Sequence, residues 1–485
     1  MKQKKINIQP IFAFLVMLVM MAFTGCSDDD SFTTSTSARL TFSADTISMD
    51  TVFATVPTTT RTFWAYNNSG DGLRCTSVRL ERGNQSGFRV NVDGTYLGEN
   101  VGYQTSDVEI RKNDSIRIFV EFTSATIYQD EMRRIEDNLV FTLESGVEQK
   151  VNLNATAWRA DMMNNVVIVS DSVISSTRPI IIYGGITINE GATLTIASGT
   201  TLYFHSDAGI NVYGRLICEG ESNQNVVLRG DRIDNMFDYL PYDRVSGQWQ
   251  GIHIYSTSKD NVLNFTDLHS AFNGIIVDST NIDQTSLTLN ASTIHNCQGY
   301  GLRVENANIT LINSQISNVL NDCLYISGGC ASLNACTLAQ YYPFDAGRGV
   351  ALRFSNSVAP LTSFLCINSL ITGYADDELM GEPNEGINFV YNFDHCVIRT
   401  PEITTEDSIY FNSVTFENIE DTISYGKKHF VLIDTDNLKY DFRLAKTSGA
   451  IGKANIETSP LTDRNATPRD SLPDIGAFEY VATDE

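Results

Sequence analysis

Residues 186–204 read ITINEGATLTIASGTTLYF, and this stretch decides the fold. Its three apolar-polar-apolar triplets start eight residues apart: Ile186-Thr187-Ile188, Leu194-Thr195-Ile196 and Leu202-Tyr203-Phe204. Strands this short are not stable as isolated hairpins. They become stable if each pairs with the strand one full coil later, about 4.8 Å along an axis, with the apolar side chains stacked inside. The spacing therefore predicts a solenoid of short parallel strands.

A second pattern gives the length of one coil. Five segments share a small residue two positions before a large apolar one: LNASTI (289–294), LINSQI (311–316), LNACTL (333–338), CINSLI (366–371) and FDHCVI (393–398). Their last residues are 22, 22, 33 and 27 positions apart. A period of 22 residues corresponds to one three-sided coil, and the longer intervals predict coils that carry inserted loops.

The region before the solenoid has a different pattern. Residues 62–66, 115–122 and 138–141 each place apolar groups on one face, as half-buried strands do, and turn-rich segments such as 67–72 separate them. Seven or eight such strands in about 120 residues predict an immunoglobulin-like sandwich. It contains no catalytic motif, so we expect a spacer or docking module.

The N-terminus predicts export and a lipid anchor. Three lysines precede an apolar run from Ile11 to Phe23, which is too short to span a membrane and is typical of a signal peptide. Cys26 follows Gly25 and resembles the acylated cysteine of a bacterial lipobox, with Phe23 where that pattern usually has Leu. The acidic residues 28–30 resemble the signal that sends some Gram-negative lipoproteins to the cell surface. The resemblance implies an outer-membrane lipoprotein with acyl chains such as palmitate on Cys26.

Composition narrows the range of partners. The net charge is −24, so nucleic acid and anionic lipid headgroups are poor partners. No cysteine pair has CxxC spacing, and we expect the eight cysteines other than Cys26 to be buried free thiols. The sequence predicts no metal site and no cofactor.

Three further segments carry a resemblance to a known family. GATLTIASGTTLYF, GQWQGIHI (247–254) and the closing PDIGAFEY (473–480) resemble right-handed parallel β-helix repeat proteins of bacterial surfaces. DTVFATV (50–56) resembles the first strand of the sandwich domain that precedes the helix in many such lipoproteins. The resemblance implies an all-β chain with an immunoglobulin-like β-sandwich followed by a right-handed parallel β-helix, a pectate-lyase-like solenoid. It implies no specific reaction.

These observations divide the chain into five parts. We predict a lipoprotein signal peptide (1–25), a flexible tether (26–37), the immunoglobulin-like sandwich (38–158), the right-handed β-helix (165–445) and a C-terminal cap segment that ends in DIGAFEY (446–485).

The β-helix fold also hosts polysaccharide lyases and hydrolases, and each of these reactions requires particular residues. Of the motifs that polygalacturonase-type hydrolases share, only an Asp-Asp pair is present, Asp376-Asp377, in an acidic loop. Residues 165–440 contain only four lysines, which gives no visible cluster to neutralise a uronate. Five histidines are scattered singly: His205, His253, His269, His295 and His395. The sequence therefore favours a role without catalysis.

The inserted loops give the candidate binding residues. Segments 231–250, 339–349 and 372–386 all replace the same turn of the coil, so stacked coils should place them on one edge. Exposed aromatic rings beside carboxylates suit sugar rings, although such rings also fold down to cover a sheet. The candidates are Phe237, Tyr239, Tyr242, Tyr341, Tyr342, Phe344, Asp376, Asp377 and the adjacent Glu378.

The sequence thus predicts a surface-anchored lipoprotein whose β-helix binds a glycan, such as a surface polysaccharide, or another macromolecule. One alternative is a polysaccharide lyase or glycoside hydrolase of the β-helix fold. Another is a purely structural envelope or adhesion protein.

Overall fold

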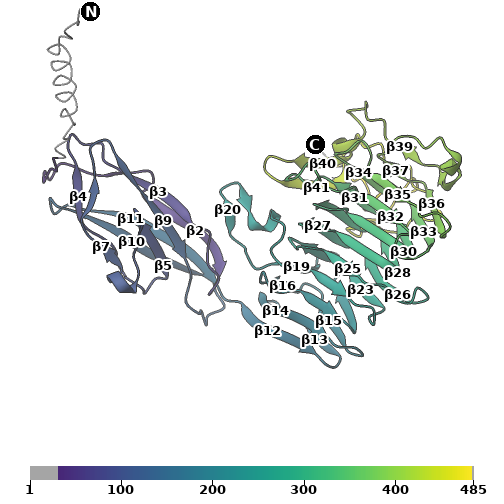
Figure 1. Cartoon of the computed structure of the whole chain (residues 1–485), viewed down its shortest axis with the longest axis horizontal. Helices are drawn as coiled ribbons and strands as arrows, with labels where there is room; N and C mark the ends of the chain where they lie inside the picture. Colours follow the sequence, from purple (N-terminus) through teal and green to yellow (C-terminus); the bar gives the residue numbers. More distant parts are fainter. Residues whose placement is uncertain (1–30, 483–485) are drawn as a thin grey trace, which may run out of the picture. The chain divides into compact units, whose positions relative to one another are not determined.

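The computed structural model describes residues 31–482, which form an all-β chain with two compact units (Figure 1). Cys26 and the predicted signal peptide lie outside the described residues. Among residues 31–482, no helix has the length and apolar character needed to cross a membrane.

The first unit is built on two antiparallel sheets. One sheet contains β1 (Thr41–Phe42), β3 (Arg61–Tyr66), β9 (Ser115–Phe122), β5 (Phe88–Val92) and β6 (Thr95–Tyr96) in that order. The other contains β2 (Thr46–Phe53), β11 (Glu148–Trp158), β10 (Arg133–Leu143), β4 (Leu73–Leu80) and β7 (Gln104–Thr105), with β8 (Val108–Ile110) also paired to β4. A short 3₁₀ helix, η1, covers Glu99–Val101.

The three strands named from the sequence lie in β3, β9 and β10. Alternate residues of β9 are buried, as the apolar alternation predicts. The ring centroids of Phe42 in one sheet and Phe141 in the other are 5.0 Å apart, so the two apolar faces pack together. The immunoglobulin-like topology itself stays a prediction.

The described part of the predicted tether differs from a flexible linker. The backbone amide of Thr33 donates to the carbonyl of Gly72, and the amide of Gly72 donates to the carbonyl of Ser31. The guanidinium of Arg74 lies over the ring of Phe32, 4.7 Å from its centroid. Residues 31–33 therefore pack on the sandwich, because Phe32 supplies an apolar ring that a polar linker would lack.

The second unit contains a 26-stranded sheet of parallel strands arranged in three stacks, which is consistent with the predicted β-helix. Stack A contains β16 (Thr201–Phe204), β19 (Val226–Gly230), β24 (Thr266–His269), β27 (Thr293–Cys297), β29 (Gln315–Val319), β31 (Thr337–Gln340), β34 (Leu370–Gly373), β37 (Val397–Ile398) and β39 (Thr415–Phe416). Stack B contains β17 (Ile210–Val212), β22 (Ile252–Ile254), β25 (Ile275–Val277), β32 (Leu352–Ser355) and β35 (Leu379–Glu382).

Stack C contains β13 (Ser172–Ile174), β15 (Thr193–Ala197), β18 (Arg215–Glu219), β23 (Asn261–Asn264), β26 (Thr285–Asn290), β33 (Leu361–Ile367), β36 (Phe389–Asp394) and β38 (Phe411–Asn412). Four longer strands turn a corner and contribute to two stacks: β12 (Asp161–Ile168), β14 (Ile180–Ile188), β28 (Leu302–Ile312) and β30 (Leu324–Asn334).

The strand register agrees with both sequence periods. Ile186 pairs with Ile210, which is three eight-residue steps later. In stack A, Ile294 pairs with Ile316, and Ile316 pairs with Leu338. The pairing continues through Ile371 to Ile398, so the intervals of 33 and 27 residues also span one coil each. These apolar residues form one continuous core between the stacks.

The small residue of the second pattern sits at a tight corner. The preceding residue has a left-handed backbone, with φ of 46° at Ala291 and 49° at Asn313. The amide of Ser292 donates to the hydroxyl of Ser314 in the next coil, at 3.2 Å. A small side chain fits inside this corner and links neighbouring coils.

Seven of the eight cysteines in the described chain are buried and Cys330 is partly exposed, and all eight are free thiols. Burial raises the pKa of Cys218 and of Cys297 to about 12, so these thiols stay protonated at neutral pH.

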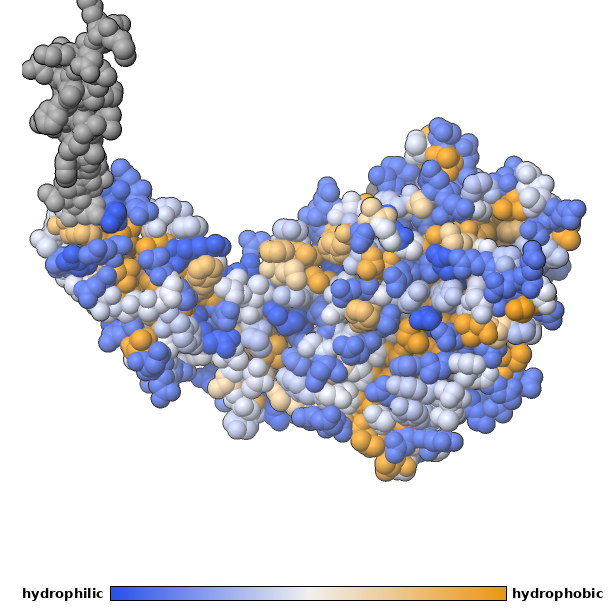
Figure 2. Space-filling model, viewed as in Figure 1, coloured by the Kyte–Doolittle hydropathy of each residue, from blue (hydrophilic) through white to orange (hydrophobic). Residues whose placement is uncertain are grey.

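The outward-facing residues of the coils are mainly hydrophilic. Figure 2 shows that hydrophilic residues predominate on the visible face, with scattered hydrophobic ones.

The chain beyond the last coil differs from its predicted boundary. The stacks end with Phe416 rather than near residue 445, and β40 (Phe430–Asp434) and β41 (Lys439–Leu444) then form an antiparallel hairpin. Two 3₁₀ helices, η3 (Glu406–Tyr410) and η4 (Gly426–His429), lie in the connecting segments.

The C-terminal segment covers the outer side of stack A. The amide of Gly476 donates to the carbonyl of Asn368, and the amide of Ala477 donates to the hydroxyl of Thr337. Leu370 and Val397 face outward from stack A and are buried in a second apolar cluster with this segment and the hairpin. The predicted cap thus covers the side of the last coils.

Candidate functional site

Three neighbouring strands of stack A present polar residues on their outer side. Leu268, Ile294 and Ile316 face the core at the middle of β24, β27 and β29. Because side chains alternate along a strand, the residues on either side of these three point outward. They are Asp267, His269, Thr293, His295, Gln315 and Ser317. In the later coils the outward residues Thr337, Ala339, Leu370, Thr372 and Val397 are buried under the chain that follows the last coil. The six polar residues, here called the polar rungs, therefore form a distinct surface.

A groove of about 540 Å³ lies over these rungs. The rungs of β27 and β29 line it together with η2 (Tyr242–Arg244), strand β41 and the C-terminal segment. The lining side chains include Asp243, Arg244, Thr293, His295, Gln315, Ser317, Lys439, Tyr440, Asp441, Arg443 and Phe478. The groove therefore joins parts of the chain that are far apart in sequence.

Basic groups outnumber acidic groups in the groove. Three basic side chains line it, from Arg244, Lys439 and Arg443, against the two carboxylates of Asp243 and Asp441. Arg443 pairs with Asp441. Within residues 31–482, Arg244 and Lys439 have no carboxylate at ion-pair distance, so their charges are available to a ligand in the groove.

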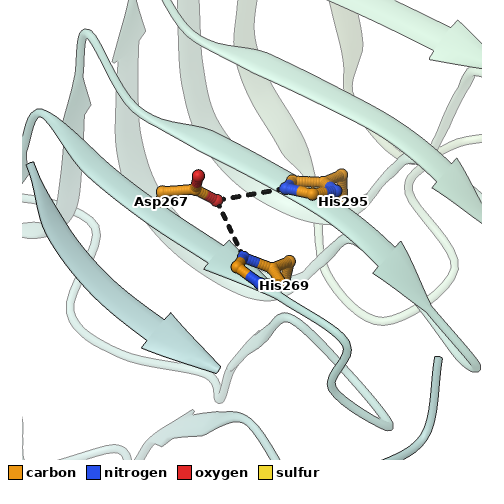
Figure 3. Close-up of side chains that lie close together, drawn as sticks. All are labelled: Asp267, His269 and His295. Carbon is orange, nitrogen blue, oxygen red and sulfur yellow. Dashed lines mark hydrogen bonds and ion pairs between the residues drawn. The ribbon is translucent and has the colours of Figure 1, made fainter. Parts of the chain in front are cut away.

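A chain of ionisable side chains runs from Arg229 to His295, and Figure 3 shows its last three members, Asp267, His269 and His295. Arg229 pairs with Asp243 at 2.7 Å, and Asp243 lies 2.9 Å from Nε2 of His269. Nδ1 of His269 and Nε2 of His295 each lie 3.1 Å from the same oxygen of Asp267. The two imidazole rings are stacked, with centroids 4.8 Å apart.

The register of the strands creates this arrangement. His269 pairs directly with His295 across β24 and β27, so the two rings lie one above the other on neighbouring coils. Asp267 lies two residues before His269 on the same face of the strand, within reach of both rings. The cluster is therefore held by regular backbone structure and not by a loop.

The charges in the cluster control its protonation. Burial alone would lower the pKa of His269, but the carboxylates of Asp267 and Asp243 outweigh it and raise that pKa to about 9. Burial alone would raise the pKa of Asp267, but His269 and His295 hold it well below its usual range. At neutral pH and without a bound metal ion, His269 is thus an imidazolium between two carboxylates.

The arrangement offers two kinds of chemistry. His295 lines the groove and has an orienting carboxylate at 3.1 Å, as a general base requires. One ligand atom from each of Asp267, His269 and His295 lies within 4.8 Å of the others, so these three residues also have the composition and spacing of a metal site.

The aromatic candidates from the first insertion remain accessible. This insertion contains a short hairpin, β20 (Asn235–Phe237) and β21 (Leu240–Pro241). Phe237 and Tyr239 are exposed, and their rings stack with centroids 5.8 Å apart. Tyr242 is half-buried beneath the guanidinium of Arg232 at 4.0 Å. None of the three lines the groove.

The candidates from the second insertion divide into buried and exposed residues. Tyr341 is fully buried against Phe430 and Phe442, so the prediction that it faces a ligand is wrong. The β40–β41 hairpin covers this ring. Tyr342 is also buried, whereas Phe344 is exposed, and both line a small cavity that shares Arg244 and Tyr440 with the groove.

The acidic candidates have structural partners. Asp376 is exposed and lies 3.2 Å from Arg399. Asp377 accepts a hydrogen bond from the hydroxyl of Thr400 at 2.8 Å. Glu378 is buried and accepts hydrogen bonds from the amides of Ala351 and Ala375. The structure does not bring these carboxylates into the groove.

The three insertions nevertheless share one corner of the coil. Each follows a strand of stack A and precedes a strand of stack B. The third is shorter than predicted, because β35 begins at Leu379. The hydroxyls of Ser246 and Tyr342 are 3.3 Å apart, and the guanidinium of Arg348 lies 4.6 Å from the ring centroid of Tyr374, so neighbouring insertions touch.

The sequence contains a signal for the cluster in the spacing between its residues, which no residue shows by itself. Asp243 and His269 are 26 positions apart, close to one coil, and the same separation joins His269 to His295. Two of the basic groups of the groove are arginines, Arg244 and Arg443, so the small number of lysines in residues 165–440 does not reveal them.

No protein-family model matches this chain, and a search of curated proteins finds none that is similar to it. The function must therefore be argued from the groove and its side chains.

Proposed function

We propose that this protein is a surface-anchored outer-membrane lipoprotein whose β-helix binds an acidic glycan in the groove over stack A. In this proposal Cys26 carries the lipid, the first unit is an immunoglobulin-like spacer, and the coils are those of a right-handed, pectate-lyase-like β-helix. The groove replaces the row of loop aromatics as the main ligand site.

The excess of basic groups in the groove carries the proposal. The whole chain has a net charge of −24, so surplus basic side chains in one groove need an explanation. Arg244 on η2 and Lys439 on β41 line the groove, and neither forms an ion pair with a carboxylate of residues 31–482, although Lys439 lies near Asp434 across the hairpin. A uronate or sulfate group would supply the missing negative charge.

The polar and aromatic lining suits a sugar. Thr293 and Asn296 are partly exposed in the groove and offer hydrogen-bonding groups to hydroxyls, and the half-buried Tyr440 offers apolar ring surface to the C–H faces of a pyranose. A polyphosphate such as nucleic acid fits the groove charge but is repelled by the acidic chain as a whole.

Removal of the two unpaired charges tests the proposal. We expect Arg244→Gln/Lys439→Gln to weaken binding of an oligogalacturonate or alginate oligomer at least about a hundredfold, because the two charge-assisted hydrogen bonds contribute about 1.5–3 kcal/mol each. Titration calorimetry on the mature chain measures the change. The binding should also weaken as salt is added.

The matched control changes the net charge equally, outside the groove. Lys259→Gln/Lys446→Gln removes two exposed lysines that do not line the groove. Equal losses in both double variants would mean that only the overall charge matters. A neutral glucan oligomer that binds as tightly as the acidic oligomers would contradict the proposed ligand class.

The lipid anchor has a separate test. Because acylation requires the thiol, we expect Cys26→Ala to move the protein from the membrane fraction to the soluble fraction. Fractionation followed by immunoblotting measures this, and protease treatment of intact cells measures surface exposure. A variant that stays in the membrane fraction would show that Cys26 is not the anchor.

A second candidate function is cleavage of the bound glycan. The position of His295, in the groove and oriented by Asp267, favours it. Ultraviolet absorbance of unsaturated products and a reducing-sugar assay distinguish a lyase from a hydrolase. Product release that His295→Gln abolishes would favour an enzyme, and binding without release would favour the binding protein. If no glycan on an array binds to the protein, a purely structural role would be the remaining interpretation.

A further inference from the structure

We propose that Asp267, His269 and His295 bind a divalent transition-metal ion of the zinc class at the floor of the groove. The ligand atoms are a carboxylate oxygen of Asp267, Nδ1 of His269 and Nε2 of His295. This site does not depend on glycan binding, and metal alone suffices to test it.

The spacing of the donor atoms fits such an ion. Zinc binds histidine nitrogen and carboxylate oxygen at about 2.0–2.2 Å, so two ligand atoms of a tetrahedral site lie roughly 3.3 Å apart. The oxygen of Asp267 lies 3.1 Å from each of the two ring nitrogens. The two ring nitrogens lie within 4.8 Å of each other, so binding an ion also requires the imidazole rings to move closer together.

The outer partners of the cluster support the same conclusion. A histidine that binds a metal usually donates its other ring N–H to a carboxylate, which fixes the tautomer. Nε2 of His269 lies 2.9 Å from Asp243, and Asp243 is held by Arg229 at 2.7 Å. A metal ion displaces the proton of Nδ1 when it binds. With the N–H kept on Nε2, the lone pair of Nδ1 then points toward Asp267, where the ion would lie.

The donor set selects the class of metal. Two imidazoles and one carboxylate suit zinc and its neighbours, whereas magnesium and calcium prefer oxygen ligands. Three protein ligands leave at least one coordination position open. His295 lines the groove, so an open position beside it would be accessible to an anionic group of a ligand.

The competing interpretation is a purely structural ion-pair network. In that case a protonated His269 joins Asp243 to Asp267, and no metal binds. The two interpretations differ in stoichiometry, because only the metal site takes up one ion per chain. They also differ in the expected effect of Asp243→Asn on metal binding. At a metal site this variant weakens binding although it removes no ligand, whereas an ion-pair network has no metal binding to weaken.

The experiment uses a tag-free mature chain, because a histidine tag would itself bind metal. After treatment with a chelator, zinc and cobalt are titrated by calorimetry, and bound zinc is measured by mass spectrometry after dialysis. We expect one ion per chain. We expect His295→Gln and Asp267→Asn each to weaken zinc binding at least a hundredfold, and Asp243→Asn to weaken it about tenfold to a hundredfold.

A matched histidine variant completes the design. His253 also pairs with a carboxylate, Asp278 at 2.9 Å, but it lies outside the cluster. His253→Gln should leave zinc binding unchanged. Circular dichroism establishes that each variant is folded, and the visible spectrum of bound cobalt reports the ligand set. Failure of the wild-type chain to take up one ion, or full uptake by folded His295→Gln, would overturn the proposal.

Discussion

Alanine in place of Gly251 is expected to lower the free energy of unfolding by about 2–4 kcal/mol, through overpacking and backbone strain together. Gly251 has a φ of +86°, and a Cβ atom there would lie 1.7 Å from the carbonyl oxygen of Asn273 in the next coil. The obstruction is backbone, which cannot rotate away. Denaturant unfolding followed by circular dichroism measures the loss.

A second glycine separates the two causes. Gly191 has a similar φ of +81°, but a Cβ atom there would have no heavy atom within 4 Å. Gly191→Ala should therefore cost only about 1–2 kcal/mol, the contribution of a left-handed backbone alone. Equal losses at Gly191 and Gly251 would mean that close stacking of the coils does not restrict position 251.

Gly251 also explains why the fold could be predicted from the sequence. At the equivalent position of several coils, the backbone of the next coil leaves no room for a Cβ atom. Glycine therefore recurs at intervals of about one coil. A Cβ at Gly251, Gly274 or Gly301 would each meet backbone of the following coil. The inward apolar residues obey the same constraint, which is why Ile294, Ile316 and their successors predicted the register.

The groove could not be predicted in this way, because its residues are not subject to a packing requirement that repeats in every coil. The outward positions of stack A can be any polar residue, so they show no period. The opposite wall comes from β41, which begins about 145 residues after His295 and belongs to no coil. Only the 26-residue separations between Asp243, His269 and His295 carried a signal.

The error at Tyr341 has the same origin. Its loop was predicted to project into solvent, and that is correct for Phe344. Tyr341 is instead buried under the β40–β41 hairpin, against Phe430 and Phe442. Nothing in the sequence of the loop indicates a hairpin that packs on it from about 90 residues away. Coil periodicity predicts contacts between coils but not what covers them.

Methionine in place of Arg469 is expected to lower the free energy of unfolding by about 3–5 kcal/mol, because it leaves buried negative charge without a partner. The Arg469 side chain is 2% exposed and lies 3.1 Å from Glu479. It also donates to the carbonyls of Asp474 and Gly476 and to the side chain of Asn313, which anchors the C-terminal segment to the coils. Denaturant unfolding measures the loss, and hydrogen exchange over residues 463–480 localises it.

The loss should depend on pH. Burial raises the pKa of Asp474 to about 6 even with Arg469 nearby, and removal of that cation would raise the pKa of Asp474 further. A carboxyl group whose pKa is higher in the folded state than in the unfolded state costs stability as pH rises from the unfolded value toward the folded one. The variant should therefore be closer to wild type at pH 5 than at pH 8.

Two controls decide whether unpaired charge is the cause. Arg469→Met/Glu479→Gln removes the charge on the partner and should recover part of the loss. Arg443→Met breaks the exposed pair with Asp441 and should cost no more than about 1 kcal/mol. If the double variant is no more stable than Arg469→Met, the loss arises from the hydrogen bonds to Asp474, Gly476 and Asn313. The C-terminal segment would then be held by geometry rather than by charge, and the dependence on pH should disappear.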